Sequence, residues 1–426
     1  MHRGTWSNGV RRASVVLAAT AVLAATAVLG VVSGPAQAAN GYLGRPPVSN
    51  HGGPVLGTGT TPGSVTVTPI YWDPAGSLAS TYKGVIDQFL TDVAADDGTD
   101  DNVYSDELQY GIHYDVHAGT PLTDSDAFPS SGCTPDTGSI YADTSGYSAC
   151  LTDAQVQSEL SAVLSANSLP SDLADLYVLF LPKGVEACKT ASNGAHNGLC
   201  SINPSSTTVL CGYHSSVSGS PPIYAALPFP IYDSATHRTC GTSRTPGYEA
   251  PNGQPDADVE VSWVSAETIG ATTDPEGTAW YDRAGREVND DCRFMYGSVL
   301  GGTTPGGLYN QVVDGHHYFL QEELSNEDYR FKRGHSCIQR IDLPVLSFRV
   351  NPPSPTHGHA VRLNAKRTRG TITNYAWNFG DSSTGSGKIV THTYHSTGTY
   401  TVTLTVTDTD GLESFMRSFS KTVTVR

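Results

Sequence analysis

The sequence predicts a disulfide-bonded large domain of α/β or α+β class, followed by a small all-β sandwich. Three observations lead to this expectation. All eight cysteines lie between Cys133 and Cys337, and no cysteine follows Pro344. Segments with helical spacing alternate with apolar strand-like runs before Pro344. After Pro344, short runs of alternating Thr and Val are separated by turn residues, which is typical of a sandwich.

Residues 1–38 have the pattern of a secretory signal peptide. Arg3, Arg11 and Arg12 precede an almost unbroken apolar run, and Ala36-Gln37-Ala38 supplies the small residues of a cleavage site. An uncleaved anchor is the alternative, because the run is nearly long enough to span a bilayer. We expect a protein that is secreted or associated with the cell wall, with no membrane segment after cleavage.

The cysteines fit this oxidising compartment, where an even number predicts disulfides. No Cys-x-x-Cys pair occurs, which argues against a zinc ribbon or a thioredoxin-type site. We expect Cys133–Cys150 and Cys292–Cys337 to pair. Spacing leaves the pairing of the other four open; these are Cys188, Cys200, Cys211 and Cys240.

Charge is distributed unevenly along the chain. The formal net charge is −16, yet from Pro344 to the end nine Lys and Arg stand against four Asp and Glu. The acidic balance argues against a nucleic-acid partner, because phosphate contacts need Lys and Arg. The basic C-terminal segment fits an anionic polymer of the cell wall or an extracellular polysaccharide, and a protein partner also stays open.

The large domain is expected at residues 64–343, after a Gly-, Pro- and Ser-rich leader arm at 39–63 with little regular structure. Its elements follow from apolar spacing. They are a strand at Val65–Trp72, a helix carrying the apolar residues from Tyr82 to Val93, a second helix capped by Asp153, a buried strand at Leu176–Leu181, a strand at Thr207–Cys211 and a third helix at Val259–Ala271.

The C-terminal segment, residues 344–426, carries three signatures in order. They are Trp377-Asn378-Phe379-Gly380-Asp381, then His392-Thr393-Tyr394, then the alternating strand Gly398–Asp408. Together they resemble the PKD (polycystic-kidney-disease repeat) domain, an immunoglobulin-like sandwich. The resemblance implies a spacer or substrate-adhesion module without chemistry of its own. Trp377 is expected in the core, with a sugar-stacking role as the alternative.

Several segments of the large domain resemble the plant EXORDIUM (phosphate-induced protein) family and its secreted bacterial relatives. They run from Gly53-Pro54-Val55-Leu56 through Ile70-Tyr71-Trp72, Leu176–Lys183, Cys211-Gly212-Tyr213-His214 and Thr272-Thr273-Asp274-Pro275 to Trp280-Tyr281-Asp282 with Gly285, Glu287, Asp290 and Cys292. In some bacterial relatives the helix before the Thr-Asp-Pro turn is similar to a zincin helix.

A zinc peptidase helix needs ligands one turn apart and a glutamate as general base. Here Ala266 and Gly270 occupy the ligand positions, and neither side chain can coordinate zinc. Glu267 remains as a weak catalytic candidate. The helix therefore argues against zinc and favours a protein without catalytic activity.

Other polar residues of the domain are weak candidates for a metal site. They are His214, Asp274, Asp282, Glu287 and Asp290, with Asp291 beside them. Carboxylates with backbone carbonyls suit calcium better than zinc, so calcium is a possible cofactor. The same aspartates also fit turns and solvated loops.

Three functions remain open at this point. The favoured one is a secreted or cell-surface, non-catalytic binding or adhesion protein with a PKD spacer or polymer-binding module. The alternative is an extracellular metal-dependent hydrolase, acting on peptides or glycans, with an atypical site. The third is a calcium-dependent wall protein.

Overall fold

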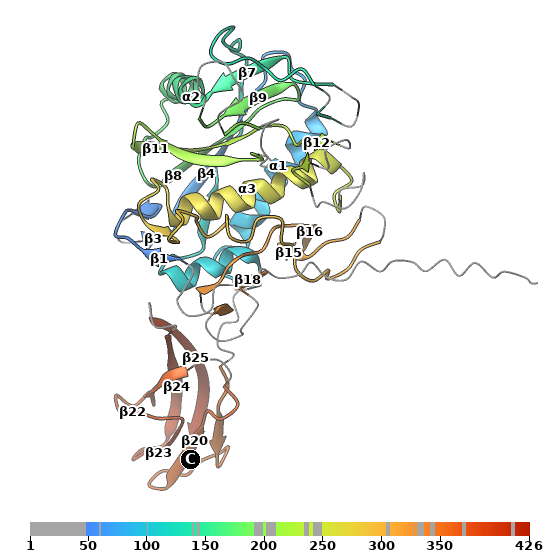
Figure 1. Ribbon diagram of the computed structural model, residues 1–426. Helices are drawn as coiled ribbons and strands as arrows, with labels where there is room; N and C mark the ends of the chain where they lie inside the picture. The colour runs from blue at the N-terminus through green and yellow to red at the C-terminus, as the bar shows by residue number, and fades with distance from the viewer. Residues whose placement is uncertain are drawn as a thin grey trace, which may run out of the picture. The chain divides into compact units, whose positions relative to one another are not determined.

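The computed structural model (Figure 1) describes residues 48–58, 61–99, 101–138, 140–141, 143, 145–190, 199–201, 210–233, 238–241, 249–303, 307–326, 328–329, 336–340, 346–368, 372–409 and 414–426. The expected signal peptide and the start of the leader arm lie outside these residues.

A mixed sheet forms the centre of the large domain. Its strands are, in spatial order, β10 (Tyr213–Val217), β11 (Ser220–Leu227), β8 (Asp175–Phe180), β4 (Ser64–Trp72) and β5 (Asp115–Ala118), with β6 (Leu122–Asp124) also paired to β4. The pairs β11–β8, β8–β4, β4–β5 and β4–β6 are parallel, whereas β10 is an antiparallel edge strand. The strands expected at Val65–Trp72 and Leu176–Leu181 are therefore present; β4 begins one residue earlier than expected, and β8 is shifted by one residue toward the N-terminus.

Helices cover both faces of this sheet. On one side α1 (Ser80–Ala95) and α3 (Pro255–Thr273) pack against alternate strand residues such as Val67 and Val178. On the other side α2 (Asp153–Asn167) packs against the intervening residues, such as Ile70 and Leu179. Because strand side chains alternate in direction, a strand covered on both faces is apolar at successive positions, as residues 176–180 of β8 are. The large domain is thus an α/β sandwich of three layers.

The three α-helices are present where the apolar spacing predicted them, but α3 begins four residues earlier and ends two residues later than the expected Val259–Ala271. Thr152, rather than Asp153, caps α2, and it forms a capping box with Gln155. Asp153 is the first helical residue, and its carboxylate accepts a hydrogen bond from Tyr213 Oη at 2.8 Å. Most of the strand expected at Thr207–Cys211 lies outside the described residues, and β10 begins at Tyr213.

Smaller elements complete the large domain. They are the 3₁₀ helix η1 (Val103–Tyr110) and the strand pairs β1 (Ser49–Asn50) with β14 (Trp280–Tyr281), β2 (Gly57–Thr58) with β3 (Thr61–Pro62), β7 (Ala149–Thr152) with β9 (Val185–Cys188), β12 (Tyr232–Asp233) with β13 (Arg238–Thr239), β15 (Gln311–Val313) with β16 (His316–Tyr318), and β17 (Glu323–Leu324) with β18 (Cys337–Ile338).

Part of the expected leader arm is built into the large domain. Val48 and Leu56 are fully buried, and β1 pairs with β14. The backbone N–H of His51 donates to Ala279 O at 2.7 Å. Residues 48–58 therefore differ from the flexible arm that their composition predicted, because the two apolar side chains fix the segment to the core.

Four disulfides join Cys133 to Cys150, Cys188 to Cys200, Cys211 to Cys240 and Cys292 to Cys337. The first and last are the two pairs expected from the sequence. Cys211–Cys240 lies beside the start of β10, and Cys292–Cys337 closes the loop that follows Glu287. Among the described residues no helix has both the length and the apolar content needed to cross a bilayer.

The C-terminal domain is a sandwich of two antiparallel sheets. One contains β19 (Arg349–Asn351), β20 (Ala360–Asn364) and β23 (Ile389–Thr393); the other contains β22 (Thr384–Ser386), β21 (Ile372–Asn378), β24 (Gly398–Thr409) and β25 (Ser414–Val425). Trp377 is buried between them against Phe348, and its Nε1 donates to Gly387 O at 2.8 Å. Trp377 is therefore a core residue rather than a sugar-stacking platform.

Candidate functional site

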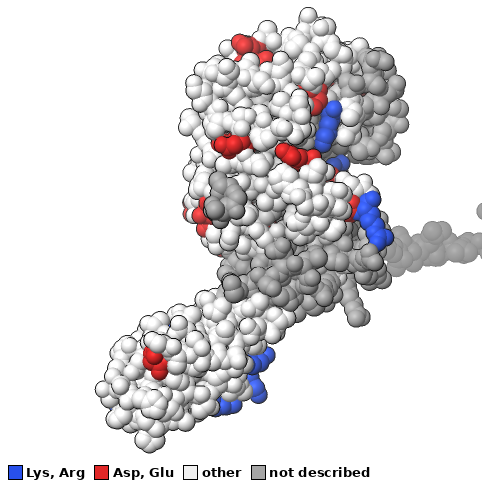
Figure 2. Space-filling model, turned by 90° about the vertical axis from the view of Figure 1, so that its left-hand side faces the viewer, with Lys and Arg blue, Asp and Glu red and all other residues white. Residues whose placement is uncertain are grey.

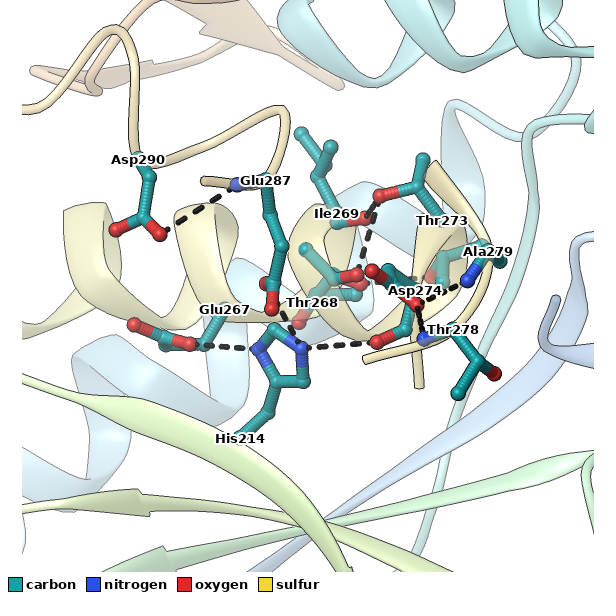
Figure 3. A network of polar contacts seen from close by, with 12 residues as sticks. His214, Glu267, Thr268, Ile269, Thr273, Asp274, Thr278, Ala279, Glu287 and Asp290 are labelled. Carbon is teal, nitrogen blue, oxygen red and sulfur yellow. Dashed lines mark hydrogen bonds and ion pairs between the residues drawn. The ribbon is translucent and has the colours of Figure 1, made fainter. Parts of the chain in front are cut away.

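Helix α3 positions Glu267 inside the large domain. Every residue of this helix from Ala257 to Thr273 is buried, so it packs on all sides. It nevertheless carries carboxylates, and Glu267 points from the helix toward β10, where it meets His214 (Figure 3). A buried charge of this kind needs a partner.

His214 supplies that partner from the edge strand β10. Its Nδ1 lies 2.9 Å from Glu267 Oε2, and its Nε2 lies 3.0 Å from Glu287 Oε2. The backbone O of Asp274 lies 3.3 Å from the same Nε2. We call these four residues the His214 cluster. Both ring nitrogens face acceptors, so the arrangement fits an imidazolium that donates two N–H groups.

The electrostatics support this protonation state. Burial alone would lower the pKa of His214, but the charges and hydrogen bonds of Glu287 and Glu267 outweigh it and raise the pKa to about 10. Burial would raise the pKa of Glu287, but the charge of His214 holds it below its usual value. The cluster is therefore an ion triad in which the His214 ring lies between Glu267 and Glu287.

Asp274 belongs to the cluster through its backbone oxygen, whereas its side chain stabilises the turn after α3. It ends α3, and its Oδ1 accepts hydrogen bonds from the backbone N–H groups of Thr278 and Ala279, both at 2.6 Å. Burial raises the pKa of Asp274 despite these bonds. The Thr-Asp-Pro sequence thus fixes the turn that brings Asp274 O to His214.

The two positions that would hold zinc on α3 are filled by packing. Ala266 is 1% exposed and lies in the apolar core. A Cβ at Gly270 would stand 2.7 Å from Asn289 Nδ2, so the loop after Glu287 occupies the space that a ligand side chain would need. Both positions are therefore occupied by core packing rather than by metal ligands.

The remaining candidates lie in salt bridges beside the cluster. Asp282 Oδ2 pairs with Arg286 at 2.7 Å, which holds the pKa of Asp282 low despite its burial. Asp291 contacts the same Arg286, and Asp290 pairs with Arg293 at 2.6 Å. The structure thus brings His214, Glu267, Glu287 and Asp274 together, and it directs Asp282 and Asp290 toward arginines instead.

The geometry of the His214 cluster does not suit one metal ion. Glu267 contacts Nδ1 of the His214 ring, whereas Glu287 contacts Nε2. The imidazole ring therefore lies between the two carboxylates and keeps them from binding the same ion. In the described part of the chain, three groups have ligand atoms close enough together for one ion, and none contains His214, Glu267 or Glu287. They are Cys133 with Cys150 and Cys188, Glu186 with Cys188 and Cys200, and Asp124 with Asp126 and Glu159. The cysteines are oxidised, which leaves the third group.

A surface cleft of about 510 Å³ lies elsewhere on the large domain. It is lined by residues of α1, of the turn before α3 and of β16: Thr81, Gly84, Val85, Gln88, Asn252, Gly253, Gln254 and Tyr318. None of these residues belongs to the His214 cluster, so Glu267 does not line this cleft.

Sequence reasoning missed the residues that close the cluster, namely Gly212 and Asn289. A Cβ at Gly212 would lie 3.0 Å from Glu267 Cγ and 2.6 Å from Leu227, so glycine allows β10 to approach α3. The contact between Gly212 and Glu267 joins residues 55 positions apart in sequence. The only local signal is the glycine between Cys211 and Tyr213.

Comparisons with known proteins concern a small part of the chain. A family model described as PKD domain matches residues 343–425. Collagenase ColA of Bacillus cereus is 49% identical over 49 residues, which are 12% of this chain and 5% of the collagenase. The chain therefore spans about one twentieth of that relative's length.

Two solved structures are similar to this chain. The PKD1 domain of Vibrio anguillarum Epp is 29% identical, with 20% of this chain and 98% of that chain covered and a TM-score of 0.16. The PKD1 domain of the Vibrio cholerae metalloprotease PrtV is 31% identical, with 19% and 96% covered and a TM-score of 0.15.

The family match agrees with the expected C-terminal sandwich. Disulfides persist in oxidising surroundings, so the four bridges and this domain indicate an extracellular protein. The C-terminal part of the chain is therefore a PKD domain.

Proposed function

We propose that the protein is a secreted, non-catalytic binding or adhesion protein whose PKD domain attaches it to an extracellular polymer. The observation that carries this proposal is the His214 cluster. A general base must reach a reacting water or substrate, whereas Glu267 is buried and already paired with an imidazolium. The cluster has the features of a structural ion triad.

The charge of the PKD domain supports an anionic polymer as partner. Arg349 and Arg362 are exposed and lie on the same outward face of β19 and β20, because Asn351 stands opposite Arg362 and Asn364 opposite Arg349. On the large domain, the acidic side chains visible in Figure 2 form separate spots rather than one patch. The similarity to collagenase ColA makes collagen a further polymer to test.

A pelleting experiment tests this proposal. The mature protein is mixed with insoluble peptidoglycan carrying anionic polymers, with chitin and with collagen fibres, and the bound fraction is measured at two salt concentrations. We expect binding to the anionic wall that weakens with salt. Replacing Arg349 and Arg362 by Gln should reduce it at least several-fold.

The matched control removes two charges elsewhere on the same domain. Lys388, whose ammonium lies over Tyr375, and Arg426 at the chain end are both changed to Gln, and binding should persist. An equal loss of polymer binding in both double variants would show that binding depends only on the net charge of the domain. Absence of polymer binding by the unmodified protein would contradict the proposal.

The alternative function is an extracellular metal-dependent hydrolase with an atypical site. Its one supporting observation is that an imidazole and two carboxylates, the residue types of zinc hydrolases, are in direct contact. Cleavage of casein or of a glycan panel that is lost with a chelator and in Glu267→Ala would favour it. For residues 64–343 we also propose kinship with the EXORDIUM family, supported by the order of the segments named above.

A further inference from the structure

We propose that Asp124, Asp126 and Glu159 form a calcium site at the end of β6. The three side chains each place a carboxylate oxygen within 4.8 Å of the other two. Asp124 is the last residue of β6, Asp126 follows two residues later, and Glu159 comes from α2. The site thus joins the edge of the sheet to the helix that covers it, at residues different from the sequence-based metal candidates.

Unpartnered oxygens point to a missing cation. Asp124 is only 9% exposed, and its Oδ2 is enclosed without a hydrogen-bond donor. Oε1 of Glu159 is likewise enclosed and without a donor. Leaving a buried carboxylate oxygen without a donor is costly, so such groups call for an explanation. Asp124 Oδ1 accepts a hydrogen bond from the backbone N–H of Asp126 at 2.9 Å.

No basic side chain offsets this negative charge. Within the described ranges, no ion pair joins a Lys, Arg or His to any of the three acids. The three carboxylates lie close together and therefore repel one another. A bound cation would remove this repulsion.

The donor chemistry selects calcium. All three side chains offer only oxygen, which suits Ca²⁺ or Mg²⁺ rather than zinc. Carboxylates can bind Ca²⁺ through one or both oxygens, and the exposed Asp126 leaves the site open to waters that complete the shell. Mg²⁺ demands a stricter octahedron, which one buried, one half-buried and one exposed acid meet less easily.

The surroundings are already fixed. Asp73 N–H donates to Asp124 O at 2.8 Å, and Trp72 Nε1 donates to Asp126 O at 2.8 Å. Phe128 packs against the Trp72 ring. Because the Trp72 indole contacts the backbone of a ligand residue, it provides a built-in sensor for a luminescent lanthanide in the same position.

The experiment uses the mature, disulfide-bonded protein at about pH 8, well above the ordinary pKa values of Asp and Glu side chains. Calcium binding is measured by calorimetry, and terbium luminescence is measured with excitation of tryptophan. We expect one Ca²⁺ per chain, with a dissociation constant of about 0.1–1 mM as in extracellular modules. At tenfold excess over that constant the folding equilibrium should shift about 11-fold. Mg²⁺ should give a clearly smaller shift.

Two variants test the residues. Asp124→Asn and Glu159→Gln should abolish both calcium binding and sensitised terbium emission. Both variants remove repulsion between carboxylates, so they should fold, and without calcium they should be at least as stable as the parent.

Asp175→Asn serves as the control, because Asp175 and Asp172 form another mutually repelling carboxylate pair outside the three-acid group. This variant should keep the full calcium response. The proposal is overturned if the parent binds no calcium, with the carboxyls sharing a proton instead. It is also overturned if the first two variants respond like the control. Polymer pelleting is scored separately, so the two proposals fail independently.

Discussion

Replacing Glu267 tests whether the His214 cluster is a structural ion triad. Glu267→Ala removes one carboxylate and leaves the Nδ1–H of a buried imidazolium facing no acceptor. Removing one partner of a buried pair costs about 3–5 kcal/mol, because the other charge stays buried. At roughly 2–4 °C per kcal/mol for domains of 150–250 residues, the melting temperature should fall by about 6–20 °C.

Glu267→Gln should have a smaller effect. The amide oxygen can still accept from Nδ1, and His214 keeps Glu287 on its other nitrogen at 3.0 Å. The expected loss is therefore smaller than the roughly 3–5 kcal/mol of Glu267→Ala, because the hydrogen bond survives and only the negative charge is removed. The order should be Ala, then Gln, then the unmodified protein.

Thermal and urea unfolding at neutral pH measure this order with the disulfides intact. The control is Glu276→Gln in the turn after α3, a partly exposed acid outside the His214 cluster, which should change stability by less than about 0.5 kcal/mol. A loss below about 1 kcal/mol in Glu267→Ala would refute the reasoning, since exposed ion pairs contribute no more than that.

Three further outcomes follow from the packing. Stability should be greatest near pH 4–5 and should fall as pH rises toward 8, as pH-dependent unfolding can measure. Burial raises the pKa of three acids far above normal, so the folded state binds more protons than the unfolded chain above about pH 4.5; they are Glu107, Glu260 and Glu323. Gly270→Ala should cost about 1–3 kcal/mol because its Cβ would meet Asn289, whereas Gly84→Ala, in open space on α1, should add about 0.5–1 kcal/mol. Trp377→Ala should destabilise the PKD domain by about 3–5 kcal/mol, so calorimetry should show its unfolding alone shifted.

Local patterns predicted most of the framework. The strand and helix periodicity located β4, α1, β8 and α3, because burial on one or both faces leaves a regular apolar spacing. The PKD signatures correctly predicted the C-terminal sandwich for the same reason, since Trp377, Phe379 and Tyr394 are all core residues.

The sequence predicted which residues belong to the His214 cluster but not how they contact one another. His214, Glu267 and Glu287 were each candidates, but their spacing of 53 and 20 residues carries no information on which nitrogen meets which carboxylate. The sequence also could not place Asn289 against Gly270, because that contact depends on a loop closed by Cys292–Cys337. The carboxylates of Asp124 and Glu159 lie 35 residues apart and meet only after α2 docks on the sheet.

The protonation state of His214 tests the central claim most directly. Long-range nitrogen–proton NMR spectra of the histidines, recorded at neutral pH with and without one equivalent of zinc, report both ring nitrogens. We predict that Nδ1 and Nε2 of His214 are both protonated and that zinc changes neither signal. Loss of one proton with stoichiometric zinc bound between His214 and a cluster carboxylate would contradict the account.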